Sequence, residues 1–158
     1  WWGNIRETPL DRLWNSDRAR QVRRNIAAEC YQEAGCNREC PFLRNSFQGP
    51  QHAPPVLELI NPEFFDPMDD SDYSKNVKEV ETAYRGRQDL LRCQPLFVDI
   101  QSTVRCNSDC FMCQQPHRDE IHLPIAIMES LAPYRATAGF FRWQGGESFI
   151  RKDFTTFL

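Results

Sequence analysis

Residues 98–117 read V-D-I-Q-S-T-V-R-C-N-S-D-C-F-M-C-Q-Q-P-H. Within this stretch Cys106, Cys110 and Cys113 form a C-x₃-C-x₂-C array, directly after an apolar run at 96–100 that predicts a buried strand. Three thiols so close together in sequence indicate metal ligation. Iron–sulfur clusters ordinarily take four cysteines, so a loop with three leaves one iron open to another ligand. A catalytic metal site needs such an open position, whereas a structural site does not.

A helix and a second strand follow the cysteine loop. Residues 123–131 predict a helix with Pro124 at its start, and residues 139–144, G-F-F-R-W-Q, predict a strand rich in aromatic side chains. A strand–helix–strand order over this length is the βαβ unit of a parallel sheet. The cysteine loop and the pair Gly145-Gly146 should therefore lie at the carboxyl ends of adjacent strands, where α/β folds bind ligands. Residues from 149 onward predict the start of another helix.

The cysteine loop and the strand that ends in Gly145-Gly146-Glu147 together resemble the radical S-adenosylmethionine (radical SAM) family. The resemblance implies that Cys106, Cys110 and Cys113 hold a 4Fe–4S cluster whose open iron is chelated by S-adenosyl-L-methionine. It also implies an enzyme that cleaves S-adenosylmethionine reductively to a 5′-deoxyadenosyl radical, which then takes a hydrogen from a substrate. The electron would come from an external donor such as a flavodoxin or a ferredoxin. The substrate, whether a peptide or a small metabolite, is not indicated.

The same resemblance implies the residues that would bind S-adenosylmethionine. The ligand's amino group would bind the glycine motif, and the residue before the third cysteine would lie against its adenine. Because glycine has no Cβ, its backbone can approach a ligand closely, and a side chain at Gly146 would crowd the ligand. Ser148 stands where the family commonly has proline. The implied binding residues are Met112, Gln144, Gly145, Gly146 and Glu147.

The implied fold class is α/β, the beginning of a partial (β/α) barrel of the radical SAM type. A complete barrel of this kind needs roughly 200 residues. We therefore expect residues 93–158 to be the N-terminal part of a radical SAM core, and the chain to be a fragment that is inactive by itself.

Zinc is the alternative ligand of the cysteines. Cys106, Cys110, Cys113 and His117 would make a closed Cys₃His site, which would be a non-catalytic zinc-binding module. The strand–loop–helix–strand setting and the glycine pair favour iron–sulfur over zinc. An electron-transfer ferredoxin is disfavoured because the fourth cysteine is not nearby.

Two helices are predicted near the N-terminus, one that begins at Thr8 and Pro9 and one that begins at Ser16 and Asp17. The second helix carries four arginines, which we interpret as a solvated helix face with basic residues towards its C-terminal end, in preference to an anion-binding or nucleic-acid-binding patch. These arginines are Arg18, Arg20, Arg23 and Arg24.

A second resemblance covers residues 1–44. The phrase G-N-I-R-E-T-P-L-D-R-L-W-N-S at residues 3–16, followed by Cys30, Cys36 and Cys40, resembles the closing part of a SPASM-type domain. Such domains accompany radical SAM enzymes and hold auxiliary iron–sulfur clusters. The resemblance implies Cys36 and Cys40 as ligands of an auxiliary cluster that this segment alone cannot complete. Cys30 is a candidate third ligand and equally a buried free thiol.

Composition limits the remaining possibilities. The 158 residues are enough for about one ordinary domain, and a net charge of −3 with a pI near 5.6 does not suggest nucleic-acid binding. No apolar run is long enough to span a membrane. Seven cysteines in clusters favour metal ligation in a reducing compartment, so we expect a cytoplasmic protein. Residues 45–92 are expected to be a linker, rich in proline and aspartate up to residue 74, followed by a helical connection.

Overall fold

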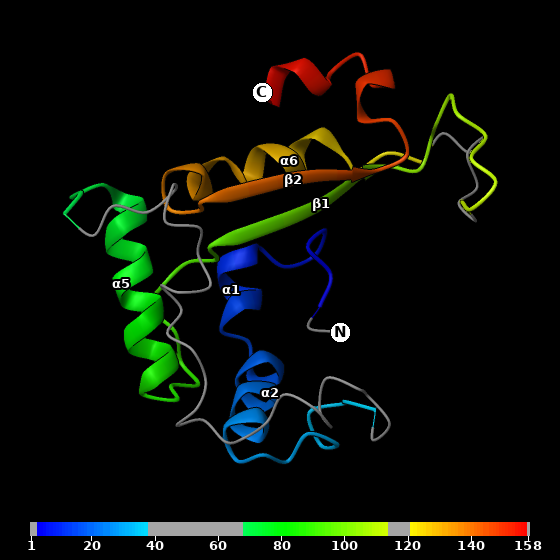
Figure 1. Ribbon diagram of the computed structural model, residues 1–158. Coiled ribbons are helices and arrows are strands. Elements are labelled where there is room, and N and C mark those ends of the chain that lie inside the picture. Colours follow the sequence, from blue (N-terminus) through cyan, green and yellow to red (C-terminus); the bar gives the residue numbers. More distant parts are fainter. Residues whose placement is uncertain (1–2, 38–67, 114–120, 158) are drawn as a thin grey trace. The chain divides into compact units, whose positions relative to one another are not determined.

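The computed structural model describes residues 3–37, 68–113 and 121–157 (Figure 1). The chain divides into two compact units, Trp1–Gln94 and Pro95–Leu158. The predicted ligands Cys40 and His117, together with residues 45–67 of the predicted linker, lie outside the described residues.

The first unit is helical in its described part. Its helices are α1 (Leu10–Trp14), α2 (Asp17–Ala27) and α5 (Asp72–Arg85). α2 begins where predicted, because the hydroxyl oxygen of Ser16 accepts a hydrogen bond from the backbone N–H of Ala19 at 3.3 Å. α1 begins one residue later than expected: Pro9 is its N-cap, and no side chain caps it. Thr8 was therefore wrongly predicted as the cap.

α5 begins inside the stretch that was expected to be a linker. The hydroxyl oxygen of Ser71 accepts a hydrogen bond from the backbone N–H of Ser74 at 3.2 Å, and Asp72 places an acidic side chain in the first turn. Val77 is completely buried, whereas Tyr84 is 45% exposed. One good cap and one buried face are thus enough to form a helix directly after an acidic, proline-rich sequence.

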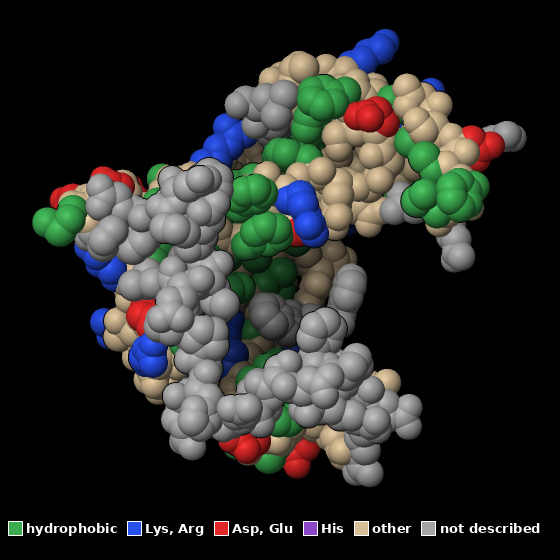
Figure 2. Space-filling model, viewed as in Figure 1, with side chains coloured by type: hydrophobic (Ala, Val, Ile, Leu, Met, Phe, Trp, Pro, Cys, Tyr) green, Lys and Arg blue, Asp and Glu red, His purple; other side chains and the backbone are tan. Residues whose placement is uncertain are grey.

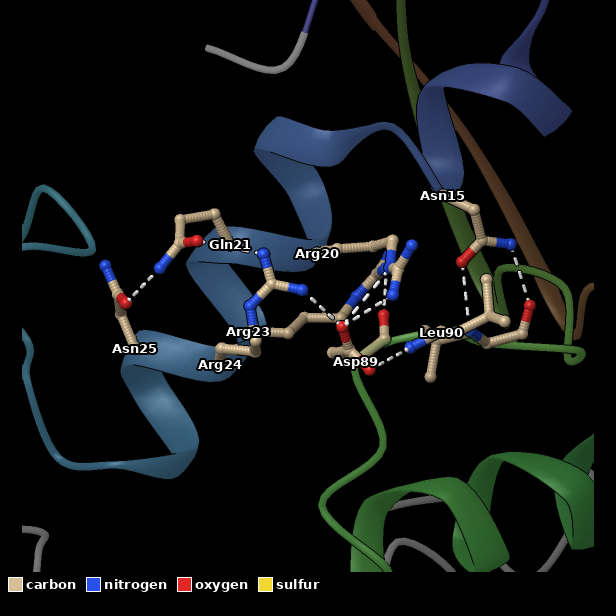
Figure 3. Close-up of polar contacts among 9 residues, drawn as sticks. Asn15, Arg20, Gln21, Arg23, Arg24, Asn25, Asp89 and Leu90 are labelled. Atoms are coloured by element: carbon tan, nitrogen blue, oxygen red, sulfur yellow. Dashed lines mark hydrogen bonds and ion pairs between the residues drawn. The ribbon is translucent and has the colours of Figure 1, made fainter.

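Three of the four arginines of α2 bind the segment that follows α5 (Figure 3). Arg20 and Arg24 donate hydrogen bonds to Oδ2 of Asp89 at 3.2 and 2.5 Å. Arg23 donates to the backbone carbonyls of Asp89 at 3.0 Å and Trp14 at 2.6 Å, and its guanidinium lies 4.9 Å from the centre of the Trp14 ring. Arg18 and Arg24 are exposed, as expected of a solvated helix face, but that interpretation was wrong for Arg20 and Arg23, which are half-buried and bind Asp89.

Further hydrogen bonds attach the same segment to α1. The side chain of Asn15 donates to the carbonyl of Leu91 at 2.7 Å and accepts from its N–H at 2.9 Å. The indole N–H of Trp14 donates to the carbonyl of Cys93 at 2.9 Å. Cys93 itself is 3% exposed, and burial raises the pKa of its thiol. The N-terminal helices and residues 86–94 therefore belong to one packed unit.

The second unit contains a two-stranded parallel sheet with helical turns. Strand β1 (Phe97–Thr103) pairs in parallel with β2 (Phe140–Gly145), and between them lie α6 (Ile125–Ser130) and the 3-10 helix η3 (Ala132–Ala136). The predicted strands, the helix that follows Pro124 and the parallel pairing are confirmed. Residues after 149 do not form the expected α-helix. They form the 3-10 helices η4 (Ser148–Ile150) and η5 (Phe154–Phe157).

One face of this sheet carries the core of the second unit. Met128 of α6 and Phe154 of η5 are each 2% exposed and pack with Leu123 and Trp143. The rings of Trp143 and Phe154 meet edge to face, with centroids 5.3 Å apart. Burying side chains of this size contributes roughly 1.5–3 kcal/mol each, so this face holds the strands and helices together.

The other sheet face is polar and aromatic. Phe97 stacks on Phe140 with ring centroids 5.7 Å apart, and Arg142 forms an ion pair with Asp99. Because side chains alternate along a strand, this face is distinct from the one that packs on α6 and η5. The helices and the two-stranded parallel sheet make this unit mixed α/β, and the partial barrel remains a prediction.

The described part of the chain contains no helix that is long and apolar enough to cross a membrane. On the face drawn in Figure 2, the basic side chains of the described residues are scattered among apolar and uncharged areas.

Candidate functional site

The two predicted motifs meet at the carboxyl ends of the paired strands. Thr103 at the end of β1 is the register partner of Gly145 at the end of β2. Beyond the strands, the N–H of Gly146 donates to the carbonyl of Thr103 at 2.8 Å, and the N–H of Glu147 donates to the carbonyl of Arg105 at 2.9 Å. The glycine motif is therefore hydrogen-bonded to the residues that open the cysteine loop.

The close approach of the cysteine loop explains why this position carries two glycines. A Cβ at Gly146 would lie 2.5 Å from the carbonyl carbon of Arg105 and closer still to its oxygen. A Cβ at Gly145 would lie 2.9 Å from Cγ of Gln101 and closer still to the carbonyl oxygen of Thr103. Gly145 also has φ +119°, a conformation that residues with a Cβ rarely adopt. The sequence interpretation invoked a bound ligand, but the atoms nearest to an added Cβ belong to β1 at Gly145 and to the start of the cysteine loop at Gly146.

A short antiparallel contact closes the base of the cysteine loop. Thr103 is bridged to His122, the N–H of Val104 donates to the carbonyl of Ile121 at 3.1 Å, and the N–H of Leu123 donates to the carbonyl of Ser102 at 2.9 Å. The chain therefore leaves β1 at Thr103 and returns antiparallel beside it at His122.

The hydroxyl of Thr103, which is 2% exposed, sits at the centre of this base. It lies 2.8 Å from Nδ1 of His122 and accepts a hydrogen bond from the N–H of Arg105 at 3.0 Å. His122 was not singled out from the sequence. Its position directly after the loop, in an apolar triplet, is the signal that could have identified it.

The three loop cysteines are free thiols at the solvent-facing end of the sheet. Cys106 is half-buried, and its sulfur accepts a hydrogen bond from the N–H of Ser108 at 3.4 Å. Cys110 and Cys113 are exposed, and the backbone N–H of Cys113 donates to the carbonyl of Cys110 at 2.9 Å. Among the residues that the structure describes, no group of three His, Cys, Asp or Glu side chains is gathered closely enough to hold a metal ion. The chemistry of the donors nevertheless fits an iron–sulfur cluster, which binds through soft thiolates.

The other predicted site residues take several positions. Met112 is 72% exposed, and Gln144 lies on the polar sheet face beside Gln101. The carboxylate of Glu147 accepts a hydrogen bond from the N–H of Phe149 at 3.1 Å and so caps η4. Glu147 thus has a structural role beside the one implied by the resemblance.

Ser148 fills a packed position that the sequence did not indicate. It is 8% exposed, and its hydroxyl lies 2.8 Å from the hydroxyl of Ser102 in β1. Ser148 therefore packs β1 against the segment that follows the glycine pair.

The N-terminal cysteines belong to the first unit. Cys30 and Cys36 are exposed, and Cys36 donates its backbone N–H to the carbonyl of Tyr31 at 2.9 Å. The exposure of Cys30 excludes the alternative that it is a buried thiol. Cys40, the predicted partner of Cys36, lies outside the described residues.

Comparison with known proteins finds no protein-family model, no curated protein and no solved structure that matches the chain. A functional assignment therefore depends on the residues of the chain and on their geometry.

Proposed function

We propose that this chain belongs to a radical SAM enzyme and contributes the cluster loop and the S-adenosylmethionine amino site. One observation carries the proposal: Gly146 and Glu147 are hydrogen-bonded to Thr103 and Arg105, immediately before the three-cysteine array. The close packing of the two glycines on the end of β1 and on Arg105 holds the two motifs side by side.

Cys106, Cys110 and Cys113 would hold a 4Fe–4S cluster, with one iron left for S-adenosylmethionine. When bound, this cluster supplies the electron that breaks a carbon–sulfur bond of S-adenosylmethionine and releases the 5′-deoxyadenosyl radical. The chain's own residues would bind and orient that ligand.

The glycine motif offers acceptors to the amino group of the ligand. The N–H groups of Gly146 and Glu147 already donate to Thr103 and Arg105, so the carbonyl oxygens of Gly145 and Gly146 would be the backbone groups that accept from a ligand. A protonated amino group needs acceptors, which matches that chemistry. Gln144 adds a side-chain amide on the polar sheet face, and the flexible thioether of Met112 can cover the flat adenine ring.

The wider assignment follows the same resemblance. The reaction would take place in the cytoplasm, with a flavodoxin or ferredoxin as the electron donor and with an unidentified substrate. Cys36 and Cys40 would contribute to an auxiliary iron–sulfur cluster of the SPASM type.

Metal and sulfide analysis tests the proposal. Protein purified without oxygen should be brown and should contain about four irons with matching acid-labile sulfide for the loop cluster. In the complete enzyme, Cys110→Ala should lose that cluster together with the reductive formation of 5′-deoxyadenosine. Cys93→Ala removes a thiol of the first unit and should retain both. Stoichiometric zinc without sulfide would overturn the proposal in favour of the Cys₃His module.

A further inference from the structure

Arg151 is a buried cation in the segment that follows the glycine motif. The residue is 7% exposed, and its side chain is 4% exposed. Arginine is rarely buried to this extent unless its donors are satisfied. The structure supplies four hydrogen bonds for these donors, two to backbone carbonyls and two to a carboxylate.

The two carbonyls belong to the two sides of the cysteine loop. Nη1 of Arg151 donates to the carbonyl of Ser102 at 2.8 Å and to the carbonyl of Leu123 at 2.8 Å. Ser102 lies just before the loop leaves β1, and Leu123 lies just after the loop returns. Nη1 of Arg151 therefore hydrogen-bonds to residues at both ends of the loop.

The same guanidinium is anchored to the segment that carries the glycine motif. Nε and Nη2 donate to the two carboxylate oxygens of Asp153 at 2.9 and 2.8 Å. This bidentate pair fixes the plane of the guanidinium, and a hydrogen bond to Arg151 lowers the pKa of Asp153. The hydroxyl contact between Ser148 and Ser102 at 2.8 Å supports the same connection on the side nearer to the glycines.

This geometry has a consequence for a ligand that spans the two motifs. Such a ligand touches the cysteine loop at one end and the glycines at the other, so its binding depends on the distance between them. A constellation of this kind must be held to within about 0.5 Å by residues that are themselves locked in place. Arg151 is the described side chain that bonds to both ends of the loop while belonging to the glycine-bearing segment.

We propose that Arg151 is a positioning residue that sets the spacing between the cysteine loop and the Gly145-Gly146 motif, and so tunes the affinity for S-adenosylmethionine. The inference rests on the proposed function. Arg151 does not touch the cysteines, so it acts through the backbone of Ser102 and Leu123.

The test compares Arg151→Met, Arg151→Lys and Asp153→Asn with the parent in the intact protein. Lys152→Met is the matched control, because Lys152 is the exposed neighbour in sequence. Three quantities are measured: iron and sulfide content, the change that S-adenosylmethionine causes in the electron paramagnetic resonance spectrum of the reduced cluster, and kcat and KM for 5′-deoxyadenosine formation.

Arg151→Met should retain iron, because the cysteines are unchanged. Its KM for S-adenosylmethionine should rise about 10–100-fold, as is typical when a residue that supports a ligating group is removed. The spectral change should need correspondingly more S-adenosylmethionine. Arg151→Lys keeps the positive charge but loses the planar guanidinium with its several N–H donors. Its KM should therefore lie between those of the parent and the methionine variant. Asp153→Asn should resemble the lysine variant, and Lys152→Met should match the parent.

Other outcomes separate the two ideas. A parent without cluster or cleavage activity would overturn the proposed function and this inference with it. An active parent with unchanged KM in Arg151→Met would overturn only the role of Arg151. Iron loss that parallels activity loss in every Arg151 and Asp153 variant, with unchanged KM in the remaining holoprotein, would show that Arg151 only maintains the fold.

Discussion

At the scale of single residues, a position can require glycine for two reasons: a left-handed backbone conformation, or a lack of space for a Cβ. The chain shows both at Gly35, Gly145 and Gly146. Gly35 has φ +92° but has no atom within 4 Å of an added Cβ. Gly146 has no left-handed φ, but an added Cβ would collide with the backbone of Arg105. Gly145 combines both problems. The backbone of Arg105 cannot rotate away as a side chain can, so the collision at Gly146 must move the cysteine loop.

Alanine substitutions of these glycines should therefore differ in their effect on iron. Gly35→Ala should cost about 1–3 kcal/mol in unfolding free energy from its backbone strain and should keep the loop cluster. Gly146→Ala should cost at least about 1–3 kcal/mol from overpacking and should also lose iron, because Arg105 directly precedes Cys106. Gly145→Ala should be the most destabilised of the three. Urea unfolding and iron analysis check these results, and full iron content in Gly146→Ala would contradict them.

At the scale of elements, the first unit depends on hydrogen bonds between α2 and residues 86–94. Arg23 is the central residue, since it donates to the carbonyls of Asp89 and Trp14 and stacks on the indole ring. Burial lowers the pKa of this guanidinium, and the neighbouring Cys93 and Asp89 oppose that shift. Removal of its side chain would leave two carbonyls without their donor.

Arg23→Met should accordingly destabilise the first unit by about 1–3 kcal/mol, the usual cost of losing hydrogen bonds from a charged donor. Arg18→Met lies on the same helix but at an exposed position, and it should change the unfolding free energy by less than about 0.5 kcal/mol. Thermal or urea unfolding followed by circular dichroism distinguishes the two variants. Equal effects would show that the contacts of Arg23 add no stability.

At the scale of the whole molecule, both units contain carboxylates whose pKa lies below the ordinary value of 3.8. A side-chain hydrogen bond from Ser71 lowers the pKa of Asp69, and one from Arg151 lowers the pKa of Asp153. Desolvation raises the pKa of Asp89, but hydrogen bonds from Arg24 and Arg20 outweigh it.

These shifts predict how stability changes in acid. Between the folded and unfolded pKa values the unfolded chain binds more protons, so stability rises with pH in that range. The contribution of Asp69, Asp89 and Asp153 is fully present above about pH 4 and is lost as the pH falls through their folded values. Urea unfolding at pH 7 and at steps below pH 4 measures it. Replacement of each by Asn should lower stability at pH 7 and weaken the acid dependence. An unchanged acid dependence in all three variants would contradict the assignment.

Local patterns in the sequence were sufficient for much of the second unit. Apolar runs and prolines placed β1, α6 and β2 to within a few residues, and the strand–helix–strand order made the pairing parallel. The meeting of the cysteine loop with Gly145-Gly146 follows from that pairing, because parallel strands end at the same sheet edge. The short 3-10 turns after residue 148 escaped this reasoning because their side chains pack on the sheet and do not follow a helical period.

The sequence by itself therefore determined which motifs face each other, and the tertiary structure determined what holds them together. Contacts between distant residues have no local pattern. The pairing of Arg24 with Asp89 spans 65 positions, and that of Arg151 with Ser102 spans 49. Nothing in the sequence around one residue of such a pair indicates its partner. The register that brings Gly146 against Arg105 likewise arises only when β1 and β2 pair. It is set by the packing of both strands on one core.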